Sequence, residues 1–315
     1  MLFLLISPLQ AAEYRPAPEG ASGWQQKTTA QGTNFMAVTA HPLATQAAYK
    51  ILETGGSAVD AAIAAQLVLG LVEPQSSGLG GGAFVLHYNA QNGRLTSWDG
   101  RETAPLSAAP AMFLDDNGRP LPFYDAVLGP RSVGVPGTPL LLRTLHRDFG
   151  VLPWRDLFGD AVRHASQGFK ITPRLAALIA DDRARLNQNA DARVYLLGGT
   201  GLPKKAGDVL KNPDYAATLK AYRDRGARVF YNTADKAQVA QKIVWASENR
   251  VIDRDLASYK VKKRAPVCGG YRGYKVCSMG EPSSGGLTLI QILGLVERFG
   301  LSALGPKSPQ AWHII

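Results

Sequence analysis

The order of the predicted elements indicates an α+β fold. Two apolar helices come first, a strand hairpin follows, a mainly helical middle comes next, and a second hairpin leads into another apolar helix. Strands and helices do not alternate singly, which argues against the βαβ pattern of a parallel sheet. Of the 315 residues 45% are hydrophobic and 19% are charged, as is typical of a folded globular chain.

The first two helices carry clear end signals. Residues 41–54 have apolar positions at helical spacing and stop at Gly55 and Gly56, a strong C-cap. Ser57 then provides an N-cap with the acidic Asp60 three residues later. The run that follows, up to Pro74, is apolar on almost every side, so we expect the second helix to be buried between layers.

The strands and the remaining helices follow from turn signals and periodicity. Residues 83–88 read as an apolar strand, and the turn at 89–93 leads into a second strand at 94–99. The predicted helices of the middle are 138–149, 153–167, 173–187, 213–225 and 234–248. The end of the chain is predicted as strands within 260–279, with a turn at 271–274, and a helix at 287–299.

The net charge of +10 does not form a nucleic-acid site. The one dense basic run is Lys260, Lys262, Lys263 and Arg264, and no aromatic residues interleave with it. Acidic residues are interspersed with the other basic ones, so a solvated basic surface is the better interpretation. We therefore expect no nucleic-acid partner.

The two ends of the chain carry unusual signals. Residues 1–12 are similar to the end of a secretory signal peptide that lacks its positive start, although a buried N-terminal segment is the alternative. Residues 13–33 read as an N-terminal tail and 34–315 as the folded portion. Ser308 and Pro309 begin a helix that gets only six more residues, so we expect a chain cut short. A periplasmic or secreted location is predicted.

Two loops have both a possible binding role and a purely structural interpretation. The glycine-rich segment 78–82 stands in the order helix, loop, strand, whereas a phosphate loop needs strand, loop, helix, so we expect close backbone packing rather than nucleotide binding. Ser283 and Ser284 precede a helix, where they fit an N-cap as well as an anion site.

The histidines and cysteines do not indicate a metal site. No two of the five histidines stand at ligand spacing. Cys268 and Cys277 lie on opposite arms of a predicted hairpin, and they fit either small buried hydrophobic side chains or a cross-hairpin disulfide.

Arg101 is the most suggestive single residue. It follows a predicted strand and Gly100, which is a good position for pointing a guanidinium into a cleft, where it could pair bidentately with a carboxylate. The alternative is an arginine tied to Asp99 or Glu102 at the end of the strand.

Taken in order, several segments resemble the γ-glutamyltranspeptidase family from about Met36 to the end of the chain. They are GGSAVDAAIAA (55–65), SSGLGGGAF (76–84), DGRETAP (99–105), VGVPGTP (133–139), DLASYKV (255–261), YRGYKV (271–276) and PSSGG (282–286). Each is weak alone, but their shared order makes a chance resemblance very improbable.

The resemblance implies an N-terminal-nucleophile hydrolase, an αββα four-layer sandwich that would be incomplete in this chain. Such a precursor cleaves itself, and the new N-terminal Thr of the small subunit takes the γ-glutamyl group of glutathione and passes it to water or to an amino acid or peptide. That Thr would lie beyond Ile315, so no catalytic residue is expected here and the chain alone should be inactive. No cofactor and no metal are implied.

Only one substrate contact transfers by the resemblance. Arg101 matches the family arginine that binds the α-carboxylate of the γ-glutamyl donor, and Glu102 would orient it. The segments around Gly80 and Ser283 would shape the wall of the cleft without taking part in the chemistry. Two rival functions stay open: a related amidase such as a cephalosporin (glutaryl) acylase, and a non-catalytic remnant that binds γ-glutamyl compounds.

Overall fold

The computed structural model describes residues 28–315, so the predicted signal peptide (1–12) and most of the predicted tail (13–33) lie outside the described part. The chain divides into two compact units. Residues 37–167 and 211–315 form the larger one, and 168–210, together with the described residues up to Met36, form the smaller one.

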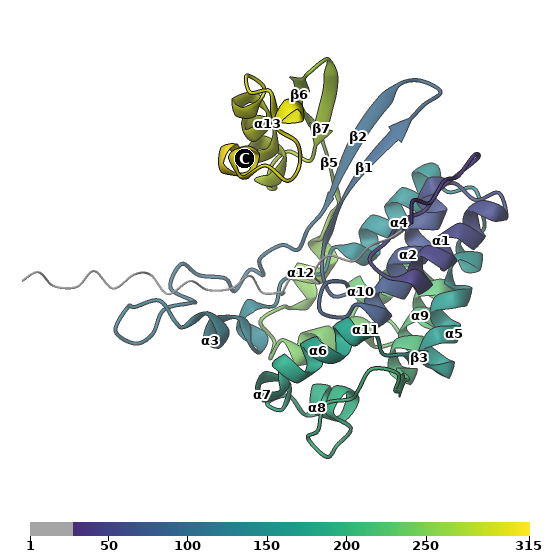
Figure 1. The fold of residues 1–315 in the computed structure, drawn as a ribbon. Coiled ribbons are helices and arrows are strands. Elements are labelled where there is room, and N and C mark those ends of the chain that lie inside the picture. Colours follow the sequence, from purple (N-terminus) through teal and green to yellow (C-terminus); the bar gives the residue numbers. More distant parts are fainter. Residues whose placement is uncertain (1–27) are drawn as a thin grey trace, which may run out of the picture. The chain divides into compact units, whose positions relative to one another are not determined.

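A layer of helices is the core of the larger unit (Figure 1). Its centre is α2 (Ala58–Val72), which packs along α1 (Pro42–Glu53) and is buried at most of its positions. Further helices cover α2 or pack against its neighbours: α4 (Thr138–Phe149), the 3-10 helix η2 (Trp154–Phe158), α5 (Gly159–Gln167) and α9 (Pro213–Arg225). The predicted burial of the second helix is therefore confirmed.

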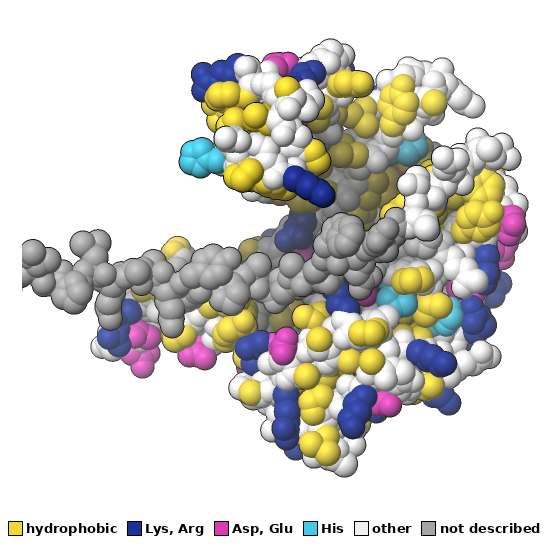
Figure 2. All heavy atoms as spheres, in the orientation of Figure 1, with side chains coloured by type: hydrophobic (Ala, Val, Ile, Leu, Met, Phe, Trp, Pro, Cys, Tyr) yellow, Lys and Arg dark blue, Asp and Glu magenta, His cyan; other side chains and the backbone are white. Residues whose placement is uncertain are grey.

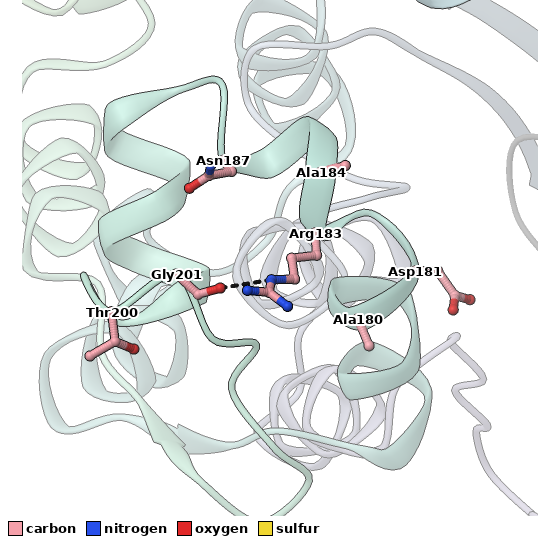
Figure 3. Close-up of a pocket in the computed structure, with 7 residues that line it drawn as sticks. All are labelled: Ala180, Asp181, Arg183, Ala184, Asn187, Thr200 and Gly201. Atoms are coloured by element: carbon pink, nitrogen blue, oxygen red, sulfur yellow. Dashed lines mark hydrogen bonds between the residues drawn. The ribbon is translucent and has the colours of Figure 1, made fainter.

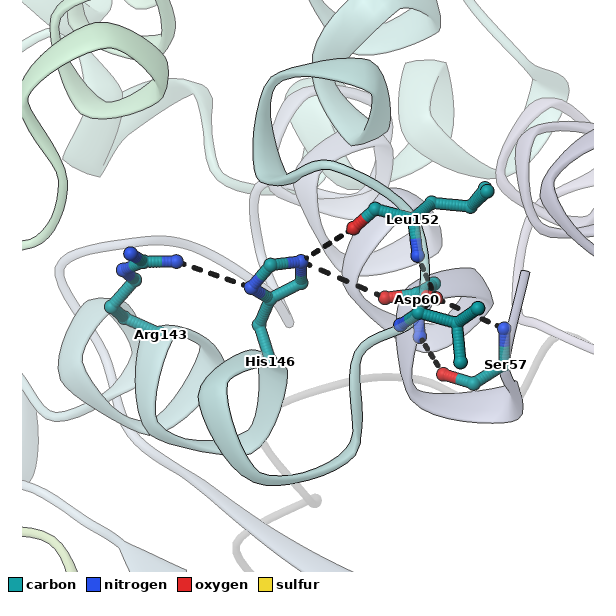
Figure 4. A network of polar contacts seen from close by, with 6 residues as sticks. Ser57, Asp60, Arg143, His146 and Leu152 are labelled. Atoms are coloured by element: carbon teal, nitrogen blue, oxygen red, sulfur yellow. Dashed lines mark hydrogen bonds and ion pairs between the residues drawn. The ribbon is translucent and has the colours of Figure 1, made fainter.

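Asp60 ties the start of α2 to the loop that follows α4 (Figure 4). Ser57 and Asp60 form the predicted capping box, at 3.0 and 3.1 Å. The same carboxylate oxygen accepts the N–H groups of Val151 (2.9 Å) and Leu152 (3.1 Å). His146 Nε2 lies 2.9 Å from the carbonyl oxygen of Leu152, which can only accept, so that ring nitrogen carries the proton. One fully buried side chain thus joins two segments that lie about 90 positions apart in the chain.

Aromatic rings fill the space between α9 and its neighbours. Trp154, Phe158 and Phe230 each meet Tyr222 edge to face, with ring centroids 5.1–5.4 Å apart. The Tyr222 hydroxyl donates to the carbonyl of Pro139 at 2.6 Å, so this buried polar atom is satisfied.

The main sheet of the larger unit is antiparallel and joins distant parts of the sequence. Its order is β1 (Ala83–Asn89), β2 (Arg94–Gly100) and β5 (Lys262–Arg264). The predicted first hairpin is confirmed, with Ala83 opposite Gly100. In the second pairing, which the sequence did not predict, Asp99 stands opposite Lys262. This pairing brings the basic run to the strand that ends just before Arg101.

A second hairpin supports an exposed helix near the end of the chain. β6 (Val267–Tyr271) pairs with β7 (Tyr274–Ser278), and α13 (Gly285–Val296) packs on both strands. Cys268 and Cys277 stand opposite each other and form a disulfide, which decides between the two predicted alternatives. Hydrophobic side chains lie on the surface of this part (Figure 2), among them Leu287, Leu289 and Leu295, which are 55%, 41% and 62% exposed.

The remaining elements are short. In the larger unit they are α3 (Phe123–Val127), η1 (Pro130–Ser132), α10 (Arg228–Tyr231), α11 (Val239–Ala246), α12 (Asp253–Ser258), α14 (Leu301–Leu304) and α15 (Pro309–Ile314). In the smaller unit they are β3 (Phe169–Lys170), α6 (Pro173–Asp181), α7 (Arg183–Leu186), α8 (Ala190–Leu197) and β4 (Val209–Leu210). None of the helices found between residues 28 and 315 is long and apolar enough to cross a membrane.

Two predicted helices are shorter than periodicity suggested. The segment 173–187 breaks at Asp182, whose backbone leaves the helical region and separates α6 from α7. Of the segment 234–248 only α11 is helical, because the Asp235 side chain accepts from the N–H of Ala237 and pairs with Arg225, which holds this part as a turn.

Candidate functional site

Three of the glycine-containing segments meet beside the end of β2 in the larger unit. The carbonyl of Gly81 accepts the N–H groups of Gly137 (2.9 Å) and Thr138 (3.0 Å). Thr103 and Val135 pair as an isolated antiparallel bridge, with the N–H of Val135 donating to Thr103 at 2.9 Å. Main-chain bonds therefore hold the glycine loop, the segment after β2 and the VGVPGTP segment together.

Two glycines permit this close approach. A Cβ on Gly82 would lie 2.6 Å from the Cα of Arg101 and 2.6 Å from the Glu102 carboxylate. A Cβ on Gly137 would overlap the carbonyl oxygen of Gly100 and the hydroxyl of Tyr259. No side chain fits at either position, so the close backbone packing predicted for the glycine loop is confirmed at Gly82.

The main chain of Arg101 is held from both sides. Its N–H donates to Asp99 Oδ1 at 2.9 Å, and its carbonyl accepts from the hydroxyl of Tyr259 at 2.8 Å. Asp99 is buried, and its other oxygen pairs with Arg264 Nε at 2.7 Å. Asp99 is a local support on β2, whereas Tyr259 and Arg264 come from distant parts of the sequence. Together they hold the backbone of Arg101.

Tyr259 stays protonated in this position. Burial, reinforced by the nearby carboxylates of Asp99 and Glu102, raises the pKa of its hydroxyl. The hydroxyl therefore donates to the Arg101 carbonyl throughout the physiological pH range.

The side chain of Arg101 is half exposed at the edge of a cavity of about 650 Å³. Its Nε lies 3.3 Å from Glu102 Oε2, and the guanidinium carbon lies 5.7 Å from the centre of the Phe84 ring. Within residues 28–315 Glu102 is its one ion-pair partner, so the terminal nitrogens remain available. The structure thus combines both predicted alternatives. Glu102 pairs with a guanidinium that still faces open space, and Asp99 binds the main chain of Arg101 but not its side chain.

The other residues singled out in the sequence do not gather here. Ser284 is the N-cap of α13 without a side-chain cap bond, and Ser283 Oγ accepts the N–H of Gly285 at 3.3 Å. Neither lines the cavity beside Arg101. In the part of the chain that the structure describes, no three His, Cys, Asp or Glu side chains are grouped as a metal site would require.

A second hollow, of about 610 Å³, lies in the smaller unit (Figure 3). Arg183 lines it and donates from Nε to the carbonyl of Gly201 at 2.9 Å, while the Asp181 carboxylate points away from that guanidinium. Its polar groups do not converge on a common point, so we place the candidate site at Arg101.

Sequence reasoning missed three contributors to the site. Tyr259 and Gly137 lie in motifs that the sequence displayed, DLASYKV and VGVPGTP, but only the fold shows that they support the backbone at Gly100 and Arg101. Arg131, a second arginine on the cavity wall, belongs to no motif that would have marked it.

Comparison with known proteins gives one consistent result. Residues 44–315 match the family model described as Gamma-glutamyltranspeptidase. A Bacillus subtilis (strain 168) protein named glutathione hydrolase proenzyme is 34% identical over 304 residues, which are 96% of this chain and 51% of that protein. A Pseudomonas sp. (strain V22) protein named acylase ACY 1 proenzyme is also 34% identical, over 95% of this chain and 54% of its own length.

The fold agrees with the sequence comparison. The crystal structure of Helicobacter pylori gamma-glutamyltranspeptidase superimposes with a TM-score of 0.85 at 36% identity, covering 91% of this chain and 81% of that chain. The predicted α+β class and the N-terminal-nucleophile hydrolase fold are confirmed by this likeness. The chain spans about half the length of the curated relatives it matches.

Proposed function

The chain belongs to the gamma-glutamyltranspeptidase family, and on that premise we propose that it is the large-subunit part of a γ-glutamyltransferase that also hydrolyses glutathione. In the proposed reaction the γ-glutamyl amide bond breaks and an ester forms on the Thr of a small subunit cut from the same precursor. The leaving amine departs with a proton, and water or an amino acid or peptide then takes the acyl group. The Thr lies outside these 315 residues.

The way in which Arg101 is held supports a specific role for this chain, which is binding of the donor substrate. Arg101 has a backbone fixed by Asp99 and Tyr259, a side chain oriented by Glu102, and terminal nitrogens that face a cavity. A guanidinium held in this way suits the α-carboxylate of a γ-glutamyl donor, which it can bind through two parallel hydrogen bonds.

The test uses the full-length protein with a γ-glutamyl anilide as donor. Arg101→Ala should raise the donor KM by about 10- to 100-fold, because hydrogen bonds between charged groups are lost, and should spare self-cleavage. Arg101→Lys should keep the charge but not the bidentate geometry, so its donor KM should lie between those of the unaltered protein and Arg101→Ala. An unchanged KM in Arg101→Ala would refute the assignment.

A cephalosporin (glutaryl) acylase is the second candidate, and the acylase relative at 34% identity favours it. A glutaryl group carries a carboxylate that Arg101 could also bind, but it lacks the ammonium group of a γ-glutamyl donor. Comparing kcat/KM for a γ-glutamyl and a glutaryl anilide separates the two candidates. Faster turnover of the glutaryl compound would favour the acylase.

We also propose that the protein works in the periplasm or outside the cell. The disulfide between Cys268 and Cys277 supports this location, because such bonds persist in oxidising compartments. The apolar start of the chain supports it as well. Alkylation of unreduced protein taken from cells should leave both cysteines unmodified, whereas two labelled thiols would contradict the proposal.

A further inference from the structure

A second arginine lines the cavity that holds Arg101. Arg131 belongs to the 3-10 helix η1, and its Nη1 donates to the carbonyl of Met112 at 3.1 Å. The segment around it is fixed as well, because the hydroxyl of Ser132 donates to the carbonyl of Val127 at 2.7 Å. The guanidinium is therefore anchored on one side and has further N–H groups to offer.

Arg131 lacks the carboxylate partner that two other half-buried arginines of this unit have. Arg264 pairs with Asp99, and Arg225 pairs with Asp235, in both cases with a buried carboxylate. Within the described residues 28–315 no carboxylate pairs with Arg131, although it is half buried. A partly desolvated cation without a counter-ion is unfavourable, so the site favours binding of an anion.

The charges around the cavity also favour an anionic ligand. Its ionisable side chains are Arg101, Glu102 and Arg131, which sum to one positive charge. Glu102 already pairs with Arg101, so Arg131 remains the unneutralised group. A volume of about 650 Å³ is within the range of pockets that hold small peptide-sized ligands.

We propose that Arg131 binds the C-terminal carboxylate of a γ-glutamyl peptide donor, at the opposite end from the α-carboxylate bound by Arg101. The inference rests on the proposed function and extends it to the choice of donor. Glutathione has one carboxylate at each end and a net charge of −1, which complements the cavity. Arg131 thereby selects peptides with a free C-terminus over amides and over donors without a second carboxylate.

The contact belongs to the first half of the reaction only. The C-terminal carboxylate leaves with the departing peptide, so Arg131 acts on formation of the acyl-enzyme and not on its hydrolysis. The expected signature is a change in kcat/KM that depends on the donor, with the rate of acyl-enzyme hydrolysis unaltered.

The experiment compares three donors with the full-length protein: glutathione, glutathione with its glycine carboxylate converted to a primary amide, and a γ-glutamyl anilide. In the unaltered protein, glutathione should exceed the amide in kcat/KM by about 10-fold, as expected for one charged hydrogen-bonded contact. In Arg131→Leu the preference for glutathione over its amide should disappear, so that the two kcat/KM values become equal. Arg131→Lys should keep part of the preference.

Arg119→Leu is the matched control. It also removes one arginine from the neighbouring loop, but Arg119 is 72% exposed, pairs with Asp115 and does not line the cavity. The glutathione-to-amide ratio should stay as it is in the unaltered protein.

Each outcome decides one claim. Equal kcat/KM for glutathione and its amide in the unaltered protein overturns the inference even if Arg131→Leu does not fold. An equal loss with all three donors in Arg131→Leu overturns it too, because a structural defect would act on every donor. Absence of anilide turnover in the unaltered protein would instead refute the proposed function.

Discussion

Helices α2 and α13 are almost equally apolar, yet α2 is buried and α13 is largely exposed. α2 is enclosed by α1, α4, α5 and η2, and Leu67 on it is fully buried. Among residues 28–315, α13 makes extensive contacts only with its own hairpin strands, and Leu295 on it is 62% exposed. Hydrophobic composition therefore predicts that a helix packs against other apolar surface, but not that the described part of the chain provides that surface.

The two helices are also held by different means. α2 begins with a capping box whose acidic side chain bonds a distant loop, whereas the N-cap Ser284 of α13 makes no side-chain cap bond. The hairpin below α13 is closed covalently by Cys268 and Cys277. Packing and buried hydrogen bonds stabilise the first region, and a covalent link stabilises the second.

The largest expected difference in stability between the two helices comes from substitutions at their N-termini. Asp60→Ala should lower the free energy of unfolding by about 3–5 kcal/mol, because the N–H groups of Ser57, Val151 and Leu152 all lose the buried carboxylate that accepts from them. Ser284→Ala should change it by less than about 0.5 kcal/mol. Urea unfolding of both variants provides the measurement, and equal losses would remove the distinction between the helices.

Leucine truncation tests the burial difference directly. Leu67→Ala should cost about 3 kcal/mol, since it removes a fully buried side chain and leaves a cavity. Leu295→Ala should cost less than about 0.5 kcal/mol in the 315-residue chain. The same pair in the full-length protein sharpens the comparison, because a large cost at Leu295 there would show that this face becomes covered.

The disulfide should matter to the second region alone. Cys268→Ser combined with Cys277→Ser should destabilise the β6–β7 hairpin by about 2–3 kcal/mol, because opening a loop of this length releases conformational entropy in the unfolded chain. Amide hydrogen exchange should accelerate in β6 and β7 and stay unaltered in α2. Faster exchange in α2 would contradict the independence of the two regions.

The smallest effect is a pH dependence confined to the helical layer. Burial lowers the pKa of His41, whose Nδ1 accepts the N–H of Leu43 at the start of α1. The unfolded chain therefore binds a proton first, and stability should fall as pH decreases below about 6.5, by at most about 1.4 kcal/mol per pH unit. His41→Asn keeps a capping acceptor and should flatten the profile of unfolding free energy between pH 5 and 7.5.

Some of that slope should survive in His41→Asn. Burial, followed by the charge of Arg163, also lowers the pKa of His164. A profile identical to that of the unaltered protein would mean that His41 does not titrate in this range.

Local signals predicted the elements well where the side chains nearby decide the outcome. The capping box at Ser57, the hairpin turn at 89–93 and the helix start at Ser308 are all as the sequence indicated. The breaks near Asp182 and Asp235 were missed because they depend on backbone geometry or on hydrogen bonds that periodicity does not register.

The candidate site was predicted only in part for a related reason. Arg101 could be found because the chain itself places it after a strand and a glycine. Tyr259 and Arg264, which fix its backbone, come from segments more than 150 positions away, and their role depends on the pairing of β2 with β5. Arg131 was invisible because its distinguishing property, a missing counter-charge, exists only in three dimensions.

The hydrogen bond from Tyr259 to Arg101 has a consequence for the order of events on the ribosome. The two residues are 158 positions apart, whereas the β1–β2 hairpin closes over a short turn and needs nothing later in the chain. At about 5–20 residues per second, roughly 8–30 s of synthesis separate the emergence of Arg101 from that of its partner. During that interval Asp99 can support the N–H of Arg101, but the carbonyl of Arg101 still lacks the hydroxyl of Tyr259, so the binding site is completed long after the strand that bears it.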